Sequence, residues 1–142
     1  MSTISPQTAL VYVMVVAAIA DHRLKKAELR TIHDVVQMLP IFKGFSAEHL
    51  TDDFDNCISI LEQEDGIETV LSLVGDALPA KLRNTAYALS CEVIAADRST
   101  DLVELEWLAL LRNHLKIEAL HASAIEMAVK ARYTVATVPQ TA

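Results

Sequence analysis

The order of apolar and polar residues along the chain predicts helices. Apolar residues recur every three or four positions in most segments, a spacing that keeps them on one face of a helix. The segments that begin at Ala9 and near Leu82 are apolar on every side, which is typical of helices in the middle of a bundle. We expect helices over about 6–20, 26–39, 46–61, 65–74, 79–96, 101–115 and 118–133.

Helix boundaries follow from capping residues. Ser5 before Pro6, and Ser46, are typical of helix starts, and Asp65 with Glu68 fits a capping box. Along the amphipathic segments we expect buried stripes made of Leu29, Ile32, Val36 and Leu39, of Leu50, Phe54, Cys57, Ile58 and Leu61, and of Leu105, Leu108, Leu111 and Leu115, with Asp52, Asp53 and Asp55 turned outward.

Composition supports the same fold class. Only three glycines and four prolines occur, too few for the many tight turns of an all-β fold. No linker or low-complexity segment divides the 142 residues. The sequence therefore predicts an all-α fold, a single-domain bundle of about seven helices over residues 1–142, with 1–5 and 134–142 frayed.

Charge and hydropathy restrict the partners. The formal net charge of −7 repels a phosphate backbone, so we expect no nucleic-acid partner. The apolar run from Ala9 to Ala20 ends in a sequence similar to a signal-peptidase site. However, no positive charge precedes it, Pro6 interrupts its start, and about twelve residues are too few to span a bilayer. We therefore expect a buried first helix, no membrane span and a cytoplasmic location.

Sequence motifs for catalysis are missing. The chain has no GxSxG, Walker or GxGxxG motif, and its five histidines show no HExxH spacing, so neither an enzyme nor a zinc site is predicted. Cys57 and Cys91 form no CxxC pair; two buried, reduced thiols are favoured over a lone disulfide. Trp107 is interpreted as a core or interface anchor.

A duplicated acidic unit carries the candidate chemistry. Aligning Asp21 with Asp97 also aligns Glu28 with Glu104. Each unit is an apolar helix, a short polar turn that begins with aspartate, and an amphipathic helix with a glutamate in its first turns. The two units predict a repeated helix-turn-helix within the bundle.

The residues of these units resemble a known family. They read Ala-Ile-Ala-Asp-His-Arg-Leu-Lys-Lys-Ala-Glu at 18–28 and Ile-Ala-Ala-Asp-Arg-Ser-Thr-Asp-Leu-Val-Glu at 94–104. This pattern is similar to that of the tellurite-resistance TerB family, which includes the helical domain of some membrane-anchored J-domain proteins. The resemblance implies an all-α bundle of about seven helices, acidic clusters that bind a divalent metal, and a non-enzymatic role in tellurite resistance or stress response.

The resemblance and the carboxylates together give a candidate cation site. Its residues are Asp21, Glu28, Asp97, Asp101 and Glu104, with calcium, magnesium or manganese as the expected ions. The second unit is the better candidate, because Lys25 and Lys26 oppose cation binding in the first and Asp101 enriches the second. Glu92 is a further ligand in this hypothesis. His22 and Arg98 stand where the family usually has glycine, so the loops are expected to differ in shape.

Two other interpretations stay open. Acidic residues near helix starts are favoured by unpaired backbone N–H groups and the helix dipole, so the carboxylates are also explained as purely structural. The chain would then be an adaptor or scaffold that binds a helical protein partner, or forms a homodimer, through an apolar face. The expected last helix offers one such stripe, Leu120, Ala124, Met127 and Ala131. A metal-dependent hydrolase is the more remote alternative.

Overall fold

The computed structural model describes residues 4–20, 26–96 and 102–136. This part of the chain contains helices and no strands, which confirms the predicted all-α class. Its elements are α1 (Pro6–Ile19), α2 (Lys26–Met38), the 3-10 turn η1 (Pro40–Phe42), α3 (Ala47–Leu61), α4 (Gly66–Ala77), the 3-10 turn η2 (Ala80–Leu82), α5 (Arg83–Ala95), α6 (Leu102–His114) and α7 (Ala119–Arg132).

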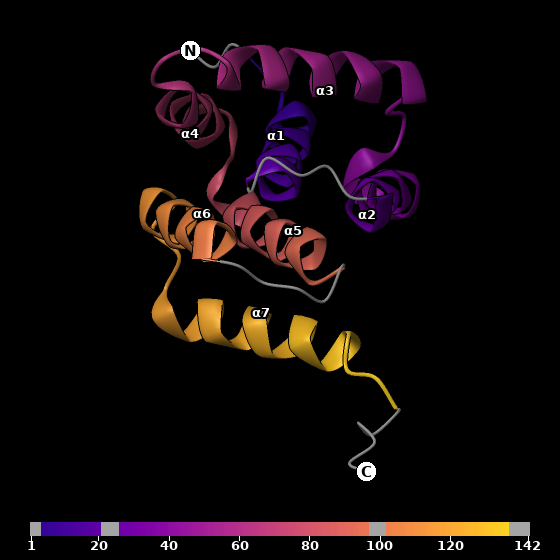
Figure 1. The fold of residues 1–142 in the computed structure, drawn as a ribbon, viewed down its shortest axis with the longest axis vertical. Coiled ribbons are helices and arrows are strands. Elements are labelled where there is room, and N and C mark those ends of the chain that lie inside the picture. The colour runs from indigo at the N-terminus through magenta and orange to yellow at the C-terminus, as the bar shows by residue number, and fades with distance from the viewer. Residues whose placement is uncertain (1–3, 21–25, 97–101, 137–142) are drawn as a thin grey trace.

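Helix α1 is the central element of the bundle. Every residue from Thr8 to Ala18 is buried, so all sides of this helix are covered. It packs against α5, α3, α4, α2 and α6, and Figure 1 shows it enclosed between α3, which crosses the top, and α5 below. The sequence prediction of an apolar central helix is confirmed.

Helix α5 is the second packing centre. It lies between α1 on one side and α7 on the other, and it also contacts α2 and α6. Its buried residues include Ala86, Tyr87, Leu89 and Val93. Helix α7 packs chiefly on α5 and forms the lower edge of the molecule in Figure 1. The successive layers are therefore α3, then α1 with α2 and α4 beside it, then α5 with α6, then α7.

Two predicted helix starts are confirmed by their caps. The Thr8 backbone N–H donates to Ser5 Oγ at 3.1 Å, with Pro6 in the first turn of α1. The His49 backbone N–H donates to Ser46 Oγ at 3.0 Å and begins α3. Each bond satisfies a backbone donor that the helix itself leaves unpaired, a contribution of about 1 kcal/mol.

The capping box predicted at Asp65 is wrong. Asp65 has a left-handed backbone with φ of 45°, and its side chain makes no cap hydrogen bond. The chain turns too tightly here for a standard cap. A Cβ on Gly66 would lie 2.6 Å from Ile60 O, so α4 can begin this close to the end of α3 only at a glycine.

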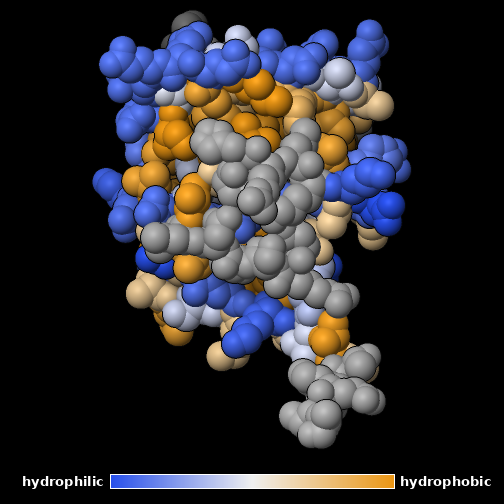
Figure 2. All heavy atoms as spheres, in the orientation of Figure 1, coloured by the Kyte–Doolittle hydropathy of each residue, from blue (hydrophilic) through white to orange (hydrophobic). Residues whose placement is uncertain are grey.

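The outer surface of α3 is polar, as expected for an amphipathic helix. Figure 2 shows it as a band of hydrophilic side chains along the top of the molecule, with apolar side chains beneath. Asp52 and Asp55 are exposed as predicted. Asp53 is not: it is only 5% exposed, because it lies one helical turn before Cys57 on the face that packs against α1.

Within the described residues, no helix combines the length and the apolar character that a bilayer span requires.

Candidate functional site

The two repeated units place a glutamate in the core at matching positions. Glu28 lies in the first turn of α2 and Glu104 in the first turn of α6, and each is 1% exposed. Lys, Glu, Arg and Asp are almost never fully buried unless they are paired. Both carboxylates have interaction partners in the structure. Burial of both at equivalent positions is the main feature that the units share.

The burial of Glu28 and Glu104 differs from the buried stripes that the sequence predicted for α2 and α6. Leu29 and Leu105 were expected inside, but they are 37% and 51% exposed. Glu28 lies one turn before the buried Ile32, and Glu104 lies one turn before the buried Trp107, so each glutamate occupies the core position expected for the leucine next to it. At the first position of each predicted stripe the glutamate is therefore buried in place of the leucine. The stripe members Ile32, Val36, Leu111 and Leu115 are buried as predicted.

The remaining predicted site residues lie outside the described residues. These are Asp21, Asp97 and Asp101, and the turns that would bring them to Glu28 and Glu104 lie there as well. Within the described ranges, no group of three or more His, Cys, Asp or Glu side chains could hold a metal ion. Convergence of the aspartates on the two buried glutamates stays a prediction.

Glu92, the further ligand considered for the second unit, has other partners. Its Oε1 accepts a hydrogen bond from Arg132 Nη2 at 2.7 Å and another from Tyr133 Oη at 3.2 Å. Both partners lie at the end of α7. Glu92 therefore joins α5 to α7, and we leave it out of the proposed cation site.

Trp107 belongs to the core, which decides between the two roles predicted for it. The side chain is 2% exposed, and its Nε1 donates to Ser90 Oγ at 3.3 Å. Ser90 Oγ in turn donates to the Val13 carbonyl at 2.9 Å. This chain of hydrogen bonds joins α6, α5 and α1, so the helix that carries Glu104 is fixed to the centre of the bundle.

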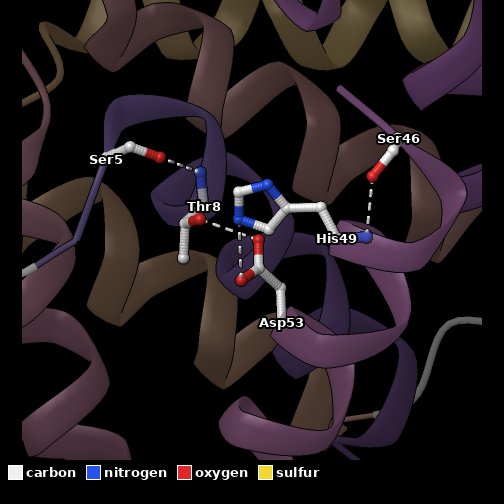
Figure 3. Close-up of polar contacts among 5 residues, drawn as sticks. All are labelled: Ser5, Thr8, Ser46, His49 and Asp53. Atoms are coloured by element: carbon white, nitrogen blue, oxygen red, sulfur yellow. Dashed lines mark hydrogen bonds and ion pairs between the residues drawn. The ribbon is translucent and has the colours of Figure 1, made fainter. Parts of the chain in front are cut away.

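A second polar contact joins α3 to the start of α1. Asp53 Oδ2 accepts a hydrogen bond from Thr8 Oγ1 at 2.7 Å, and Asp53 Oδ1 lies 3.6 Å from His49 Nε2 (Figure 3). Burial raises the pKa of the Asp53 carboxyl, although the bond from Thr8 and the proximity of His49 oppose that shift. The contact joins α3 to the start of α1.

A groove of about 830 Å³ lies between α5, α6 and α7. Its lining is mostly apolar, and its volume is within the range of ligand pockets. Tyr87 donates a hydrogen bond to Glu126 in this lining, and Arg112 Nη1 lies 3.6 Å from Glu126 Oε2. Burial, followed by the bond to Glu126, raises the pKa of Tyr87.

Both cysteines are free and buried, as predicted. Burial raises the pKa of each thiol to about 12, so the nucleophilic thiolate is scarce at neutral pH. Cys91 lines the groove, where Glu126 raises the pKa of its thiol further and Arg112 opposes that shift.

Comparison of the chain with protein-family models, with curated proteins and with solved structures found no match.

Sequence reasoning missed the contacts between distant segments. Thr8 and Asp53 are 45 residues apart, and Tyr87 and Glu126 are 39 apart. No motif joins these residues, so only the packing of helices brings them together. The burial of the two glutamates was missed as well, because the neighbouring Leu29 and Leu105 fit the apolar pattern of their helices.

Proposed function

We propose that the chain is a non-enzymatic, TerB-like helical module that binds a divalent cation through its acidic turns, with a role in tellurite resistance or stress response. The observation that carries the proposal is the matched burial of Glu28 and Glu104, each beside a leucine that is left exposed. Burial of a carboxylate costs free energy that burial of leucine would not. A functional ligand at both positions accounts for the same exchange occurring twice.

The second unit is the stronger site in this proposal. Asp97, Asp101 and Glu104 would supply three carboxylates around one turn, and hard cations prefer such oxygen ligands. The link from Trp107 through Ser90 to Val13 fixes α6 in position, which favours a preorganised ligand. In the first unit Lys25 and Lys26 reduce the attraction for a cation.

Calorimetric titration with calcium, magnesium and manganese tests the proposal. We expect saturable binding to the wild type, and at least a tenfold weaker association for Glu104→Gln, which keeps the size of the side chain and removes its charge. Glu106→Gln is the matched control, because Glu106 is exposed on the same helix. It should bind as the wild type does.

Two results would contradict cation binding. One is the absence of saturable heat at millimolar metal. The other is an equal loss for Glu104→Gln and Glu106→Gln, which would indicate attraction to overall negative charge. Circular dichroism of each variant separates loss of binding from loss of fold.

A second candidate function is an adaptor whose carboxylates are purely structural. It is favoured by four exposed residues of α7, Leu120, Ala124, Met127 and Ala131, which we call the outer stripe. Leu120 is 76% and Met127 74% exposed. In this case metal titration shows no binding, and association with a protein partner is lost in the Leu120→Glu, Met127→Glu double variant.

A further inference from the structure

Helix α7 has two apolar faces, and only one of them is covered. Ala122 and Val129 are buried against α5, with Ile125 and Tyr133 partly buried beside them. At 3.6 residues per turn, the outer stripe lies on the opposite side of the helix. Apolar and hydrophilic side chains both appear along the lower edge of the molecule in Figure 2, where α7 lies.

The spacing of the outer stripe matches a helix-pairing seam. Its residues follow one another at intervals of four, three and four, which is the alternation of the two core positions in a heptad. Large and small residues also alternate along it, as Leu120, Ala124, Met127 and Ala131. A seam of this kind packs best on a surface with the complementary order of large and small side chains.

The same stripe in the opposite direction has that complementary order. If two copies of α7 run antiparallel, Leu120 of each lies against Ala131 of the other, and Met127 lies against Ala124. A parallel pair would instead set Leu120 against Leu120 and Ala131 against Ala131, with crowding at one end and a gap at the other. Side-chain size therefore favours the antiparallel arrangement.

Charge favours the antiparallel arrangement as well. Each helix has a partial positive charge at its start and a partial negative charge at its end. Antiparallel pairing sets these opposite partial charges beside each other, so it opposes the two helix dipoles. Parallel pairing would place like charges side by side.

We propose that the outer stripe of α7 pairs with the same stripe of a second copy of this chain, and that the two helices run antiparallel about a twofold axis. The inference names the partner of the adaptor surface proposed above and is independent of cation binding. A 14-residue helix is about 21 Å long, so it covers less than the roughly 800 Å² per partner of a standard stable interface. The dimer should therefore be weak, with dissociation on the order of micromolar concentrations.

Sedimentation equilibrium of the full chain, from micromolar to several hundred micromolar, tests the proposal. We expect the mass of the wild type to rise with concentration from 15.6 kDa toward twice that value. The Leu120→Glu, Met127→Glu variant should stay at 15.6 kDa throughout. Met38→Glu is the matched control: Met38 is 79% exposed on α2, outside the stripe, and its variant should dimerise as the wild type does.

Disulfide trapping tests the direction of the helices. In an antiparallel pair, two copies of residue 131 are about 16 Å apart along the axis, so Ala131→Cys alone should not form a covalent dimer. A mixture of Ala131→Cys and Leu120→Cys chains should form the mixed dimer. Cross-linking of Ala131→Cys with itself, at the rate of the mixture, would overturn the antiparallel arrangement.

Other results would overturn self-association itself. A mass of 15.6 kDa at every concentration would do so, and so would a dimer that persists in the Leu120→Glu, Met127→Glu variant. A monomeric chain that still binds a different protein through α7 would reject the second copy and retain the adaptor. Metal titration is unaffected by any of these outcomes.

Discussion

Single residues of this protein depart from the hydrophobic pattern where a polar group enters the core. Asp53 is the case with the best-defined surroundings. Its carboxyl faces the Thr8 hydroxyl and His49, and Asp52 is close enough to affect it electrostatically. The Thr8 bond satisfies a buried oxygen that would otherwise lose its solvation without compensation. The residue is tolerated inside because its partner is fixed at the start of α1.

The raised pKa of Asp53 predicts a pH-dependent stability. A carboxyl whose pKa is higher in the folded than in the unfolded chain binds its proton more tightly in the folded state, so protonation stabilises the fold. The free energy of unfolding of the wild type, minus that of Asp53→Asn, should therefore increase as pH falls from neutral toward 4.

Urea unfolding at a series of pH values checks this. Both proteins should carry His49→Gln, because a protonated His49 would stabilise the Asp53 carboxylate and act in the opposite direction. If the difference in unfolding free energy instead decreases on acidification, the hydrogen bond from Thr8, and not burial, determines the direction in which the pKa of the Asp53 carboxyl is shifted.

At the scale of elements, sequence patterns predicted the helices well because helix formation depends on local periodicity. Ser5 and Ser46 marked their helix starts through contacts three residues away. The burial of Glu28 and Glu104 was missed because hydrophobicity alone selects the neighbouring leucines. The contact of Asp53 with Thr8 was missed because it depends on how α1 and α3 pack.

The junction of α3 and α4 gives a prediction for two glycines of one helix. Gly66→Ala should destabilise the protein by about 1–3 kcal/mol, because the new Cβ would lie 2.6 Å from the Ile60 carbonyl oxygen and 2.7 Å from Leu61 Cα, both backbone atoms. Chemical denaturation measures the change.

Gly75→Ala is the control within the same helix. The nearest atom to its Cβ, at 2.8 Å, is the ring end of the exposed His114, which can move aside. A gain in helix propensity of up to about 1 kcal/mol should make this variant neutral or more stable. Equal losses for the two variants would contradict the steric explanation.

At the scale of the molecule, the described helices share one contiguous core, built on α1 and α5 and extended to every other α-helix. Trp107 is the only tryptophan, and its contacts reach α5 and, through Ser90, α1. Its fluorescence should therefore report the unfolding of the entire bundle.

We expect tryptophan fluorescence and far-ultraviolet circular dichroism to give the same midpoint and slope in urea unfolding, as a cooperative two-state transition requires. The measurement is made on the Leu120→Glu, Met127→Glu variant, which should stay monomeric, so that self-association does not contribute. A fluorescence transition clearly separated from the loss of helix would show that α6 unfolds independently of the rest.

The position of α1 has a consequence for synthesis of the protein. This helix leaves the ribosome well before α5, which covers one of its sides and follows much later in the chain. Until then its apolar surface has nothing native to bind, and folding must wait for contacts between segments distant in sequence. A nascent chain of this kind is a natural substrate for a chaperone that holds exposed apolar segments.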